Sequence, residues 1–226
     1  MDRPSVTIHN TSSVDGRLTG FPVDLSLHYE IAGEFRHGAV LTGSGTLTAS
    51  AEDEGIDLSG EDSDEPVPGV EPDDPRPWLV IVDSRARLTR LSWLRGQPFW
   101  RDVLILCSDA TPTVHLDRLR RHRVEHVVAG ADRVDLAAAL HALADRYGVR
   151  EVRVDAGGTL NGQLLRAGLV DEISVIVAPY VLGTAQVDPV HLVDGLTEGH
   201  ARRLTLVAVQ RLRDDHVWLR YAVARA

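Results

Sequence analysis

The sequence predicts an α/β protein built on a mixed, mostly parallel β-sheet. Through the middle of the chain, short apolar runs such as 78–82 (WLVIV) alternate with helical patterns. Continuous apolar runs are typical of strands covered on both faces, and their alternation with helices indicates strands that pair in parallel. Near the C-terminus, two long alternating runs at 203–213 and 216–223 flank Asp214-Asp215, which predicts a hairpin. Because a hairpin pairs antiparallel, the expected sheet is mixed.

The first third of the chain contains three predicted elements and a long loop. Residues 5–9 alternate between polar and apolar and are expected to form a strand. Residues 22–35 begin with Pro22 and place apolar residues at helical spacing, which predicts a helix. Residues 39–42 (AVLT) predict a short buried strand that runs into GSGT. The acidic stretch 50–77 contains five prolines and shows no periodicity, so we expect a long exposed loop.

The clearest predicted helix covers residues 132–147. Leu136 and Leu140 belong to an apolar line along one face, and Gly148 supplies the stop. The other predicted elements are strands at 103–107, 124–128, 151–155 and 172–178 and a helix at 158–167. These elements complete the α/β pattern.

Length and composition predict one globular domain over residues 1–226, and they exclude a chain that is disordered throughout. Apolar residues make up 43% of the chain, and no apolar run approaches the ~20 residues of a membrane span. The N-terminal MDRPSV does not resemble a signal peptide, so we expect a cytoplasmic protein with no membrane partner. The single cysteine, Cys107, excludes an internal disulfide and a cysteine-based zinc site. The spacing of the histidines predicts no metal site.

The charge of the chain is concentrated in one segment. The formal net charge is −9, and all 24 basic residues are arginines, which excludes Schiff-base lysine chemistry and a P-loop lysine. Residues 52–74 contain eleven acidic residues and no basic one, so the remainder of the chain is nearly neutral. A short arginine run at 118–123 is interpreted as a solvated helix end. We therefore expect no nucleic-acid partner.

Small, hydroxylated and glycine residues follow nearly every predicted strand. In open α/β sheets, ligands bind outside the carboxyl ends of the parallel strands, so this pattern favours a long cofactor there. Gly157-Gly158 opens a helix directly after a strand and indicates either a phosphate site or a tight turn that needs glycine. Ser84-Arg85 fits either a clamp for a phosphate monoester, such as the 2′-phosphate of NADP, or a surface salt bridge.

Two further patterns are weaker. TGSGT at 42–46 contains a lone Gly-x-Gly, and Asp15-Gly16 is by itself a turn signal. Cys107 ends an apolar run and is interpreted as a small buried hydrophobic residue rather than a nucleophile.

The ordered set of motifs resembles a known family. The strongest block is 152–183, VRVDAGGTLNGQLLRAGLVDEISVIVAPYVLG, with its glycine-rich turn and helix followed by Gly-Leu-Val-Asp-Glu. Supporting blocks are SSVDGRL at 12–18, GSGTL at 43–47, VDSRARL at 82–88 and VDGL at 193–196. Together they resemble the reductase domain of bacterial riboflavin-biosynthesis deaminase/reductase enzymes and the stand-alone archaeal and fungal diaminopyrimidine reductases. No zinc motif of the deaminase precedes them.

The resemblance implies a dihydrofolate-reductase-like three-layer α/β/α fold and NADPH-dependent reduction of a ribosylamino-pyrimidine phosphate or of a related pyrimidine or pterin. Hydride would pass from NADPH to C1 of the opened sugar, held as an imine, while the protein positions both partners and excludes water. The residues it implies at NADPH are Thr42, Gly43, Ser44, Thr46, Ser84, Arg85, Gly130, Gly157, Gly158, Thr159 and Leu160. It implies Ser13, Asp15 and Arg17 at the substrate, with Arg17 toward the phosphate, and Asp15 and Asp155 as catalytic carboxylates. It also implies a homodimer built around the terminal strands.

The chain departs from the family at two places. The family has Glu-Gly-Gly where this chain has Asp155-Ala156-Gly157. The family's short Asp-Asp-Pro segment corresponds to residues 73–75, in a much longer loop. Alternative activities are therefore those of a dihydrofolate reductase or of a flavin- or deazaflavin-dependent reductase. A third alternative is a non-catalytic nucleotide-binding paralogue in which the acidic loop is an interaction segment.

Overall fold

The computed structural model describes residues 2–60, 62, 73–183, 190–196 and 201–224. The chain divides into two compact units. The first comprises residues 1–4 and 37–152, and the second comprises residues 5–36 and 153–226. A single domain over 1–226 stays a prediction.

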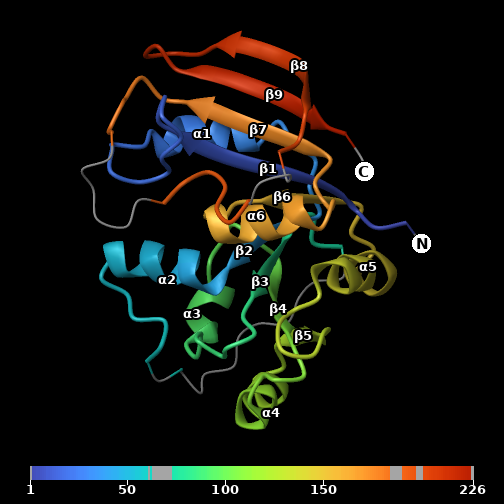
Figure 1. Cartoon of the computed structure of the whole chain (residues 1–226). Coiled ribbons are helices and arrows are strands. Elements are labelled where there is room, and N and C mark those ends of the chain that lie inside the picture. The colour runs from blue at the N-terminus through green and yellow to red at the C-terminus, as the bar shows by residue number, and fades with distance from the viewer. Residues whose placement is uncertain (1, 61, 63–72, 184–189, 197–200, 225–226) are drawn as a thin grey trace. The chain divides into compact units, whose positions relative to one another are not determined.

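The first unit is a parallel sheet with helices in the connections between its strands (Figure 1). Its strands are β2 (Ala39–Gly43), β3 (Trp78–Val82), β4 (Asp102–Cys107) and β5 (Glu125–Val128), in the order β5-β4-β3-β2. Its helices are α2 (Ser44–Asp53), α3 (Leu91–Arg95), α4 (Thr113–Arg121) and α5 (Leu136–Tyr147). In register, Gly43 pairs with Val82 and Val82 with Leu106, so these strands end side by side.

The first unit is held by a core of aliphatic side chains. Every residue of β4 is buried, as the apolar run predicts for a strand covered on both faces. The α5 helix begins after Asp135, whose side chain accepts a hydrogen bond from the Ala138 amide at 3.0 Å. It ends at Gly148, whose φ of 68° is the left-handed conformation that glycine adopts without strain. The predicted stop of this helix is therefore confirmed, whereas the helix begins at Leu136 rather than at residue 132, because Asp135 caps it there.

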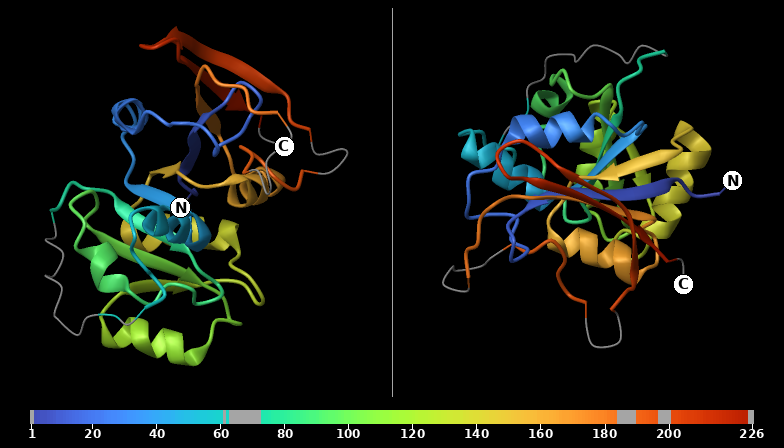
Figure 2. Two further views of the ribbon diagram at one scale, coloured as in Figure 1. Left: turned by 90° about the vertical axis from the view of Figure 1, so that its left-hand side faces the viewer. Right: turned by 90° about the horizontal axis from the view of Figure 1, so that it is seen from above.

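The second unit combines parallel and antiparallel pairing (Figure 2). Its strands are β1 (Ser5–Ser12), β7 (Glu172–Val177), β9 (Val217–Val223) and β8 (Leu204–Arg211), together with β6 (Glu151–Val154) from Arg153 onward, in the order β6-β1-β7-β9-β8. Its helices are α1 (Leu25–Ala32) and α6 (Gly158–Arg166). The β1–β7 pair is parallel, and β9 is antiparallel to both β7 and β8.

The terminal hairpin turns at Asp214 and Asp215, whose φ angles are 51° and 58°. Two successive positive φ angles match the right-handed twist of hairpin strands, and aspartate tolerates this conformation. The predicted hairpin and the mixed, mostly parallel sheet are thus confirmed.

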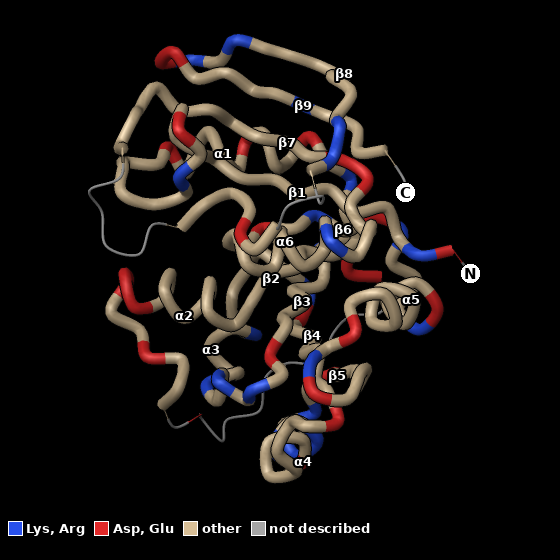
Figure 3. The backbone as a smooth tube through the Cα atoms, in the orientation of Figure 1, with Lys and Arg blue, Asp and Glu red and all other residues tan. Residues whose placement is uncertain are grey.

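Three helices differ from the sequence predictions. The GSGT segment opens α2, which continues to Asp53, so residues 50–53 are helical rather than part of the predicted loop. This helix contains one large apolar residue, Leu47, and therefore shows no apolar stripe to reveal it. Ala51 and Leu58 are buried, which also contradicts a fully exposed loop, whereas 61 and 63–72 lie outside the described residues. The short α3 was not predicted, and α4 was predicted only through its arginine-rich end, which Figure 3 shows.

Candidate functional site

The exit of β2 leads directly into the α2 N-terminus. Gly43 is the N-cap residue in an extended conformation, and among the described residues no side chain caps this helix. Thr42 and Ser44 are buried on either side of it, and Thr46 is half-buried in the first turn. A helix N-terminus without a side-chain cap leaves its first amides able to meet an anion.

A buried aspartate stabilises the turn that follows β3. Asp83 accepts hydrogen bonds from the Arg87 and Leu88 amides, both at 3.0 Å, and so closes the turn that contains Ser84 and Arg85. The Ser84 hydroxyl accepts from the Val134 amide at 3.2 Å. The Arg85 side chain is exposed and forms no ion pair with any described residue. The salt-bridge interpretation of Arg85 is therefore not supported within this part of the chain.

Gly130 follows β5 in a turn where only glycine fits. Its φ is 88°, and a Cβ there would lie 2.3 Å from the Arg133 carbonyl oxygen and 2.7 Å from the Asp135 amide nitrogen. The Gly130 carbonyl also accepts from the Asp109 amide at 2.9 Å, which joins the β4 and β5 exits. Gly130 thus has a demonstrated role in shaping this edge of the first unit.

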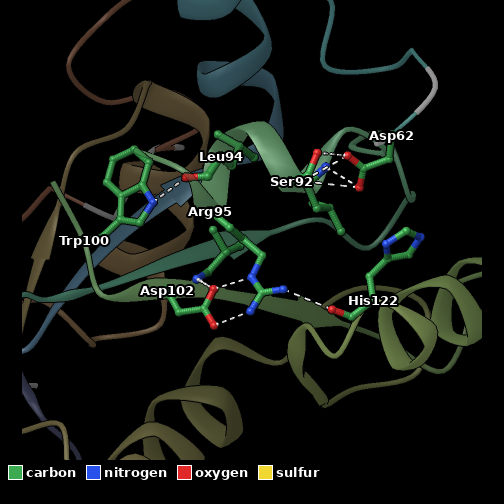
Figure 4. Close-up of polar contacts among 9 residues, drawn as sticks. Asp62, Ser92, Leu94, Arg95, Trp100, Asp102 and His122 are labelled. Carbon is green, nitrogen blue, oxygen red and sulfur yellow. Dashed lines mark hydrogen bonds and ion pairs between the residues drawn. The ribbon is translucent and has the colours of Figure 1, made fainter. Parts of the chain in front are cut away.

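A polar cluster elsewhere in the first unit was not predicted (Figure 4). The Arg95 guanidinium donates two hydrogen bonds to the Asp102 carboxylate, at 2.6 and 2.9 Å, and a third to the His122 carbonyl at 3.0 Å. Asp62, from the acidic stretch, accepts from the Ser92 amide at 3.0 Å and from the Ser92 hydroxyl. Asp62 therefore caps the short α3 helix and has a structural role.

In the second unit, Ser13, Asp15 and Arg17 belong to one hydrogen-bonded turn after β1. The Ser13 hydroxyl donates to Asp15 at 2.7 Å and accepts from the Arg17 amide at 2.9 Å. The Gly183 amide donates to Asp15 at 2.8 Å, and Arg17 Nη2 donates to the Gly183 carbonyl at 2.7 Å. The Ser13 hydrogen bond, followed by the Gly183 amide, lowers the pKa of Asp15 to about 2. Asp15 is therefore an ionised acceptor at neutral pH rather than a proton donor.

Close packing, not backbone angles, requires glycine at Gly158 and Gly162 of α6. Gly157 has an ordinary φ of −76°. A Cβ on Gly158 would lie 2.5 Å from both the Asp194 carboxylate and the His191 carbonyl, and one on Gly162 would overlap the Asp194 carbonyl. Segment 190–196 thus lies directly against the helix, and the Asp194 amide donates to the Gly158 carbonyl at 3.0 Å. The tight-turn interpretation of Gly157-Gly158 is wrong, because neither needs a left-handed angle.

The α6 N-terminus has no side-chain cap among the described residues, as at α2. Thr159 is exposed, whereas Leu160 is 7% exposed and its side chain belongs to the core. Ala156 is buried, and its carbonyl accepts from the side-chain amide of Asn10 at 3.0 Å and from that of Asn161 at 3.2 Å. The extra methyl of Ala156, compared with the family's glycine, is therefore accommodated.

Asp155 forms a contact that sequence reasoning missed. The His28 side chain on α1 bonds through Nε2 to Asp155 Oδ2 at 3.4 Å and through Nδ1 to the Thr11 hydroxyl at 3.0 Å. His28 is 6% exposed and shares the buried face of α1 with Leu27 and Ile31. A polar residue on the apolar face of a predicted helix was the signal that could have indicated it.

A second histidine, His9 on β1, lies against His28, with ring centroids 4.6 Å apart. His9 Nε2 is 3.3 Å from the His28 carbonyl, and His9 Nδ1 is 2.9 Å from the Ser174 hydroxyl. Burial, and then the charge of His28, lower the pKa of His9 to about 3, so this ring is neutral at physiological pH.

Cys107 is fully buried, as predicted, and burial raises the pKa of its thiol to about 12, so it is no nucleophile. Within the described ranges, no group of three or more His, Cys, Asp or Glu side chains is placed to hold a metal ion. None of the described helices is both long and apolar enough to span a bilayer.

The sequence profile of the RibD C-terminal domain matches residues 4–218. The chain belongs to this family.

Two curated relatives of this RibD C-terminal domain are reductases by name. A 2,5-diamino-6-ribosylamino-4(3H)-pyrimidinone 5′-phosphate reductase from Methanothermobacter thermautotrophicus is 37% identical over 125 residues, 53% of this chain and 52% of that protein. The chain thus matches about half the length of that relative. A protein of the same name from Archaeoglobus fulgidus is 28% identical over 190 residues, 80% of this chain and 83% of its own length.

Solved structures agree on the fold. RibD from Acinetobacter baumannii superposes with a TM-score of 0.69 at 25% identity, covering 98% of this chain and 58% of that one. A pyrimidine reductase-like protein from Corynebacterium diphtheriae gives a TM-score of 0.72 at 20% identity, covering 99% and 93%. The predicted dihydrofolate-reductase-like fold class is confirmed for this RibD C-terminal domain.

Proposed function

We propose that this RibD C-terminal domain is a cytoplasmic, NADPH-dependent reductase of a ribosylamino-pyrimidine phosphate in riboflavin biosynthesis. The observation that carries the proposal is the family match over residues 4–218, with relatives named as reductases of that substrate class. The strand exits add support because they carry helix N-termini without a side-chain cap and the exposed Arg85, which suit the phosphates of such ligands.

The reaction needs one hydride and one proton. The sugar ring opens when the C1–O bond breaks, the ring oxygen takes a proton, and the nitrogen lone pair forms a cationic C=N bond to C1. NADPH, when bound, would supply the hydride that adds to C1, and the C=N bond would become a secondary amine. The chain's residues therefore have to orient the sugar, stabilise the positive charge and exclude water.

The residues present fit a phosphate-rich cofactor. In the first unit, the proposed contacts are Thr42, Gly43, Ser44, Thr46, Ser84, Arg85 and Gly130. In the second unit, they are Gly157, Gly158, Thr159 and Leu160, the last through its backbone because its side chain is buried. Arg85 is the proposed partner of the 2′-phosphate that distinguishes NADPH from NADH, because its exposed guanidinium forms no ion pair within the described chain.

The proposed substrate contacts are Ser13, Asp15 and Arg17. Arg17 is 5% exposed, and its Nη1 has no hydrogen-bond partner among the described residues. A buried guanidinium with spare donors suits a phosphate oxygen. Asp15 is ionised and suits a hydroxyl or N–H of the substrate, whereas Asp155 is the proposed catalytic carboxylate.

Thermal unfolding with added cofactors tests this function. NADPH at 100 times its dissociation constant is expected to stabilise the protein by about 2.7 kcal/mol, a shift of roughly 5–10 °C, and to do so more than NADH. Arg85→Ala is expected to weaken NADPH roughly 10- to 100-fold, as expected for loss of a charged hydrogen bond, with little change for NADH. Arg121→Ala, an exposed arginine of α4, is the matched control.

Each other outcome identifies an alternative. Equal loss of NADPH and NADH in Arg85→Ala would contradict the assignment of Arg85. A shift only with a flavin or deazaflavin would indicate a different cofactor. Turnover of dihydrofolate but not of the ribosylamino-pyrimidine would indicate dihydrofolate reductase activity, and NADPH binding without turnover of either would indicate a non-catalytic paralogue.

We further propose that β8 pairs with a second copy of this chain. β8 is the last strand in the order, and Leu206, Val207 and Val209 are 53%, 51% and 61% exposed. An apolar edge strand offers both main-chain hydrogen bonds and an apolar surface to a partner, and a twofold axis lets the same strand serve both copies.

Val209→Glu is expected to convert the dimer into a monomer, because it places a charge on the apolar strand. Sedimentation equilibrium measures the mass of the particle. Val114→Glu, on an exposed residue of α4, is the control and should leave the mass unchanged. A wild-type protein that sediments as a monomer would contradict the proposal.

A further inference from the structure

The environment of Asp155 is asymmetric. Its Oδ2 atom bonds to His28, whereas its Oδ1 atom has no hydrogen-bond partner among the described residues. The Asp155 side chain is 27% exposed and the His28 side chain 7%. One oxygen is therefore held from the protein interior, and the other is left for a ligand.

The hydrogen-bond directions around His28 follow from its partners. An ionised carboxylate only accepts, so His28 Nε2 carries the proton toward Asp155. Nδ1 then accepts from the Thr11 hydroxyl when the ring is neutral, and donates to it when the ring is protonated. Thr11 and Asp155 thus fix the ring from both sides in either state.

The neighbouring His9 prevents this ring from moving. The His28 carbonyl only accepts, so His9 Nε2 donates to it, and His9 Nδ1 accepts from the Ser174 hydroxyl. Ser174 in turn accepts from the indole N–H of Trp218 at 2.8 Å. A chain of directed hydrogen bonds from β9 through β7 and β1 to α1 therefore holds the backbone that carries His28.

We propose that His28 is a positioning residue for the reduction, which orients the Asp155 carboxylate so that its second oxygen stabilises the cationic C=N intermediate. This inference rests on the proposed function. It assigns Asp155 an electrostatic role: the carboxylate stays ionised, accepts the N–H of the cation, and neither gains nor loses a proton. A fixed negative charge at the point where positive charge develops lowers the barrier to ring opening.

The charges around Asp155 agree with an ionised carboxylate. Burial raises the pKa of Asp155, but the hydrogen bond from His28 and the charges of His28 and Arg153 outweigh burial and place the pKa below its ordinary value. The other groups facing this cluster are His9 from β1, which is neutral, and Tyr29 from α1, which interacts with Arg153. His28 is the group among them that bonds directly to the carboxylate.

Substitutions at His28 separate orientation from structure. His28→Phe keeps a planar ring against His9 but removes the N–H donor, whereas His28→Gln retains a donor. We expect His28→Phe to lower kcat roughly 10- to 100-fold, as for loss of a group that orients a catalytic residue, with the KM for NADPH unchanged. His28→Gln should recover most of this loss. Asp155→Asn should lower kcat at least as much as His28→Phe.

The pH profile supplies a readout that a structural role would not move. In His28→Phe, the hydrogen bond that lowers the pKa of Asp155 is lost, while burial still raises that pKa. The acid limb of the kcat profile is therefore expected to move to higher pH. His28→Gln should return the limb toward the wild-type position. His141→Gln, at an exposed histidine of α5 outside this hydrogen-bonded chain, is the control and should leave the limb in place.

The outcomes distinguish the inference from the proposed function. If the wild-type protein binds NADPH but turns over no ribosylamino-pyrimidine, the proposed function fails. If the wild type turns over and His28→Phe, with an unchanged melting shift on NADPH, keeps the wild-type kcat and acid limb, the role of His28 is overturned. A loss in His28→Phe that His28→Gln does not rescue and that leaves the acid limb in place would also overturn it and indicate a structural role.

Discussion

Asp102→Ala is expected to lower the free energy of unfolding by about 3 to 5 kcal/mol, because it leaves a buried guanidinium without its counter-charge. The side chains of Arg95 and Asp102 are only 8% and 6% exposed, and two short hydrogen bonds join them (Figure 4). Asp102 also begins β4, and Arg95 ends α3 and bonds to the carbonyl at the end of α4. The pair therefore connects three elements of the first unit.

Guanidinium denaturation of single and double variants measures this effect. Arg95→Met should also destabilise the protein, because it leaves the Asp102 carboxylate buried alone. The double variant Arg95→Met/Asp102→Ala should lose much less than the sum of the single variants, because no isolated charge remains. Arg120→Met, in an exposed pair with Asp117, is the matched control and should change the free energy by less than about 1 kcal/mol. Additive losses in the double variant would contradict the prediction.

The second large effect concerns pH. Between pH 6.5 and about 3, protons bind His9 in the unfolded chain but not in the folded one, because burial and then the charge of His28 lower the pKa of His9 to about 3. Where the unfolded state binds more protons, the free energy of unfolding rises with pH and falls as the pH decreases. His9 alone is therefore expected to remove up to about 5 kcal/mol of stability across this window.

The comparison of His9→Gln with the wild type separates the contribution of His9 from that of the acidic residues. Protonation of those residues also lowers stability as the pH decreases. Glutamine can donate and accept but cannot gain a proton, so the variant should show a shallower loss of stability between pH 6.5 and pH 4. Urea denaturation at several pH values measures the slope. His141→Gln, in α5, carries the same change and should retain the wild-type slope. Parallel slopes for His9→Gln and the wild type would show that His9 is not the responsible group.

The elements with strong local signals were predicted from sequence. The strands at 78–82 and 103–107 lie where continuous apolar runs occur, and α5 ends at Gly148. The helix predicted over 22–35 is shorter, Leu25–Ala32, because Asp24 accepts from the Leu27 amide and caps it later. The α2 helix escaped prediction because its small polar residues show no apolar stripe.

The candidate site likewise contains residues that could be predicted from the sequence and residues that could not. Residues that follow parallel strands, such as Ser84, could be predicted, because such strands end at one edge of a sheet. The contact of His28 with Asp155 joins residues 127 apart, and a single sequence does not show which distant side chains meet. The tight-turn interpretation of Gly158 was wrong for the same reason, since the atoms that exclude a Cβ belong to segment 190–196.

The close contact of α6 with segment 190–196 determines the order in which this part of the second unit can fold. Glycine costs a helix about 1 kcal/mol relative to alanine, so α6, with Gly158 and Gly162 in successive turns, is a weak helix when alone. Its stabilising neighbour contributes the hydrogen bond from the Asp194 amide to Gly158, but lies about thirty residues later in the chain. During synthesis the ribosome therefore releases α6 before the segment that stabilises it. Full protection of the α6 amides against hydrogen exchange has to wait until that segment has emerged and docked.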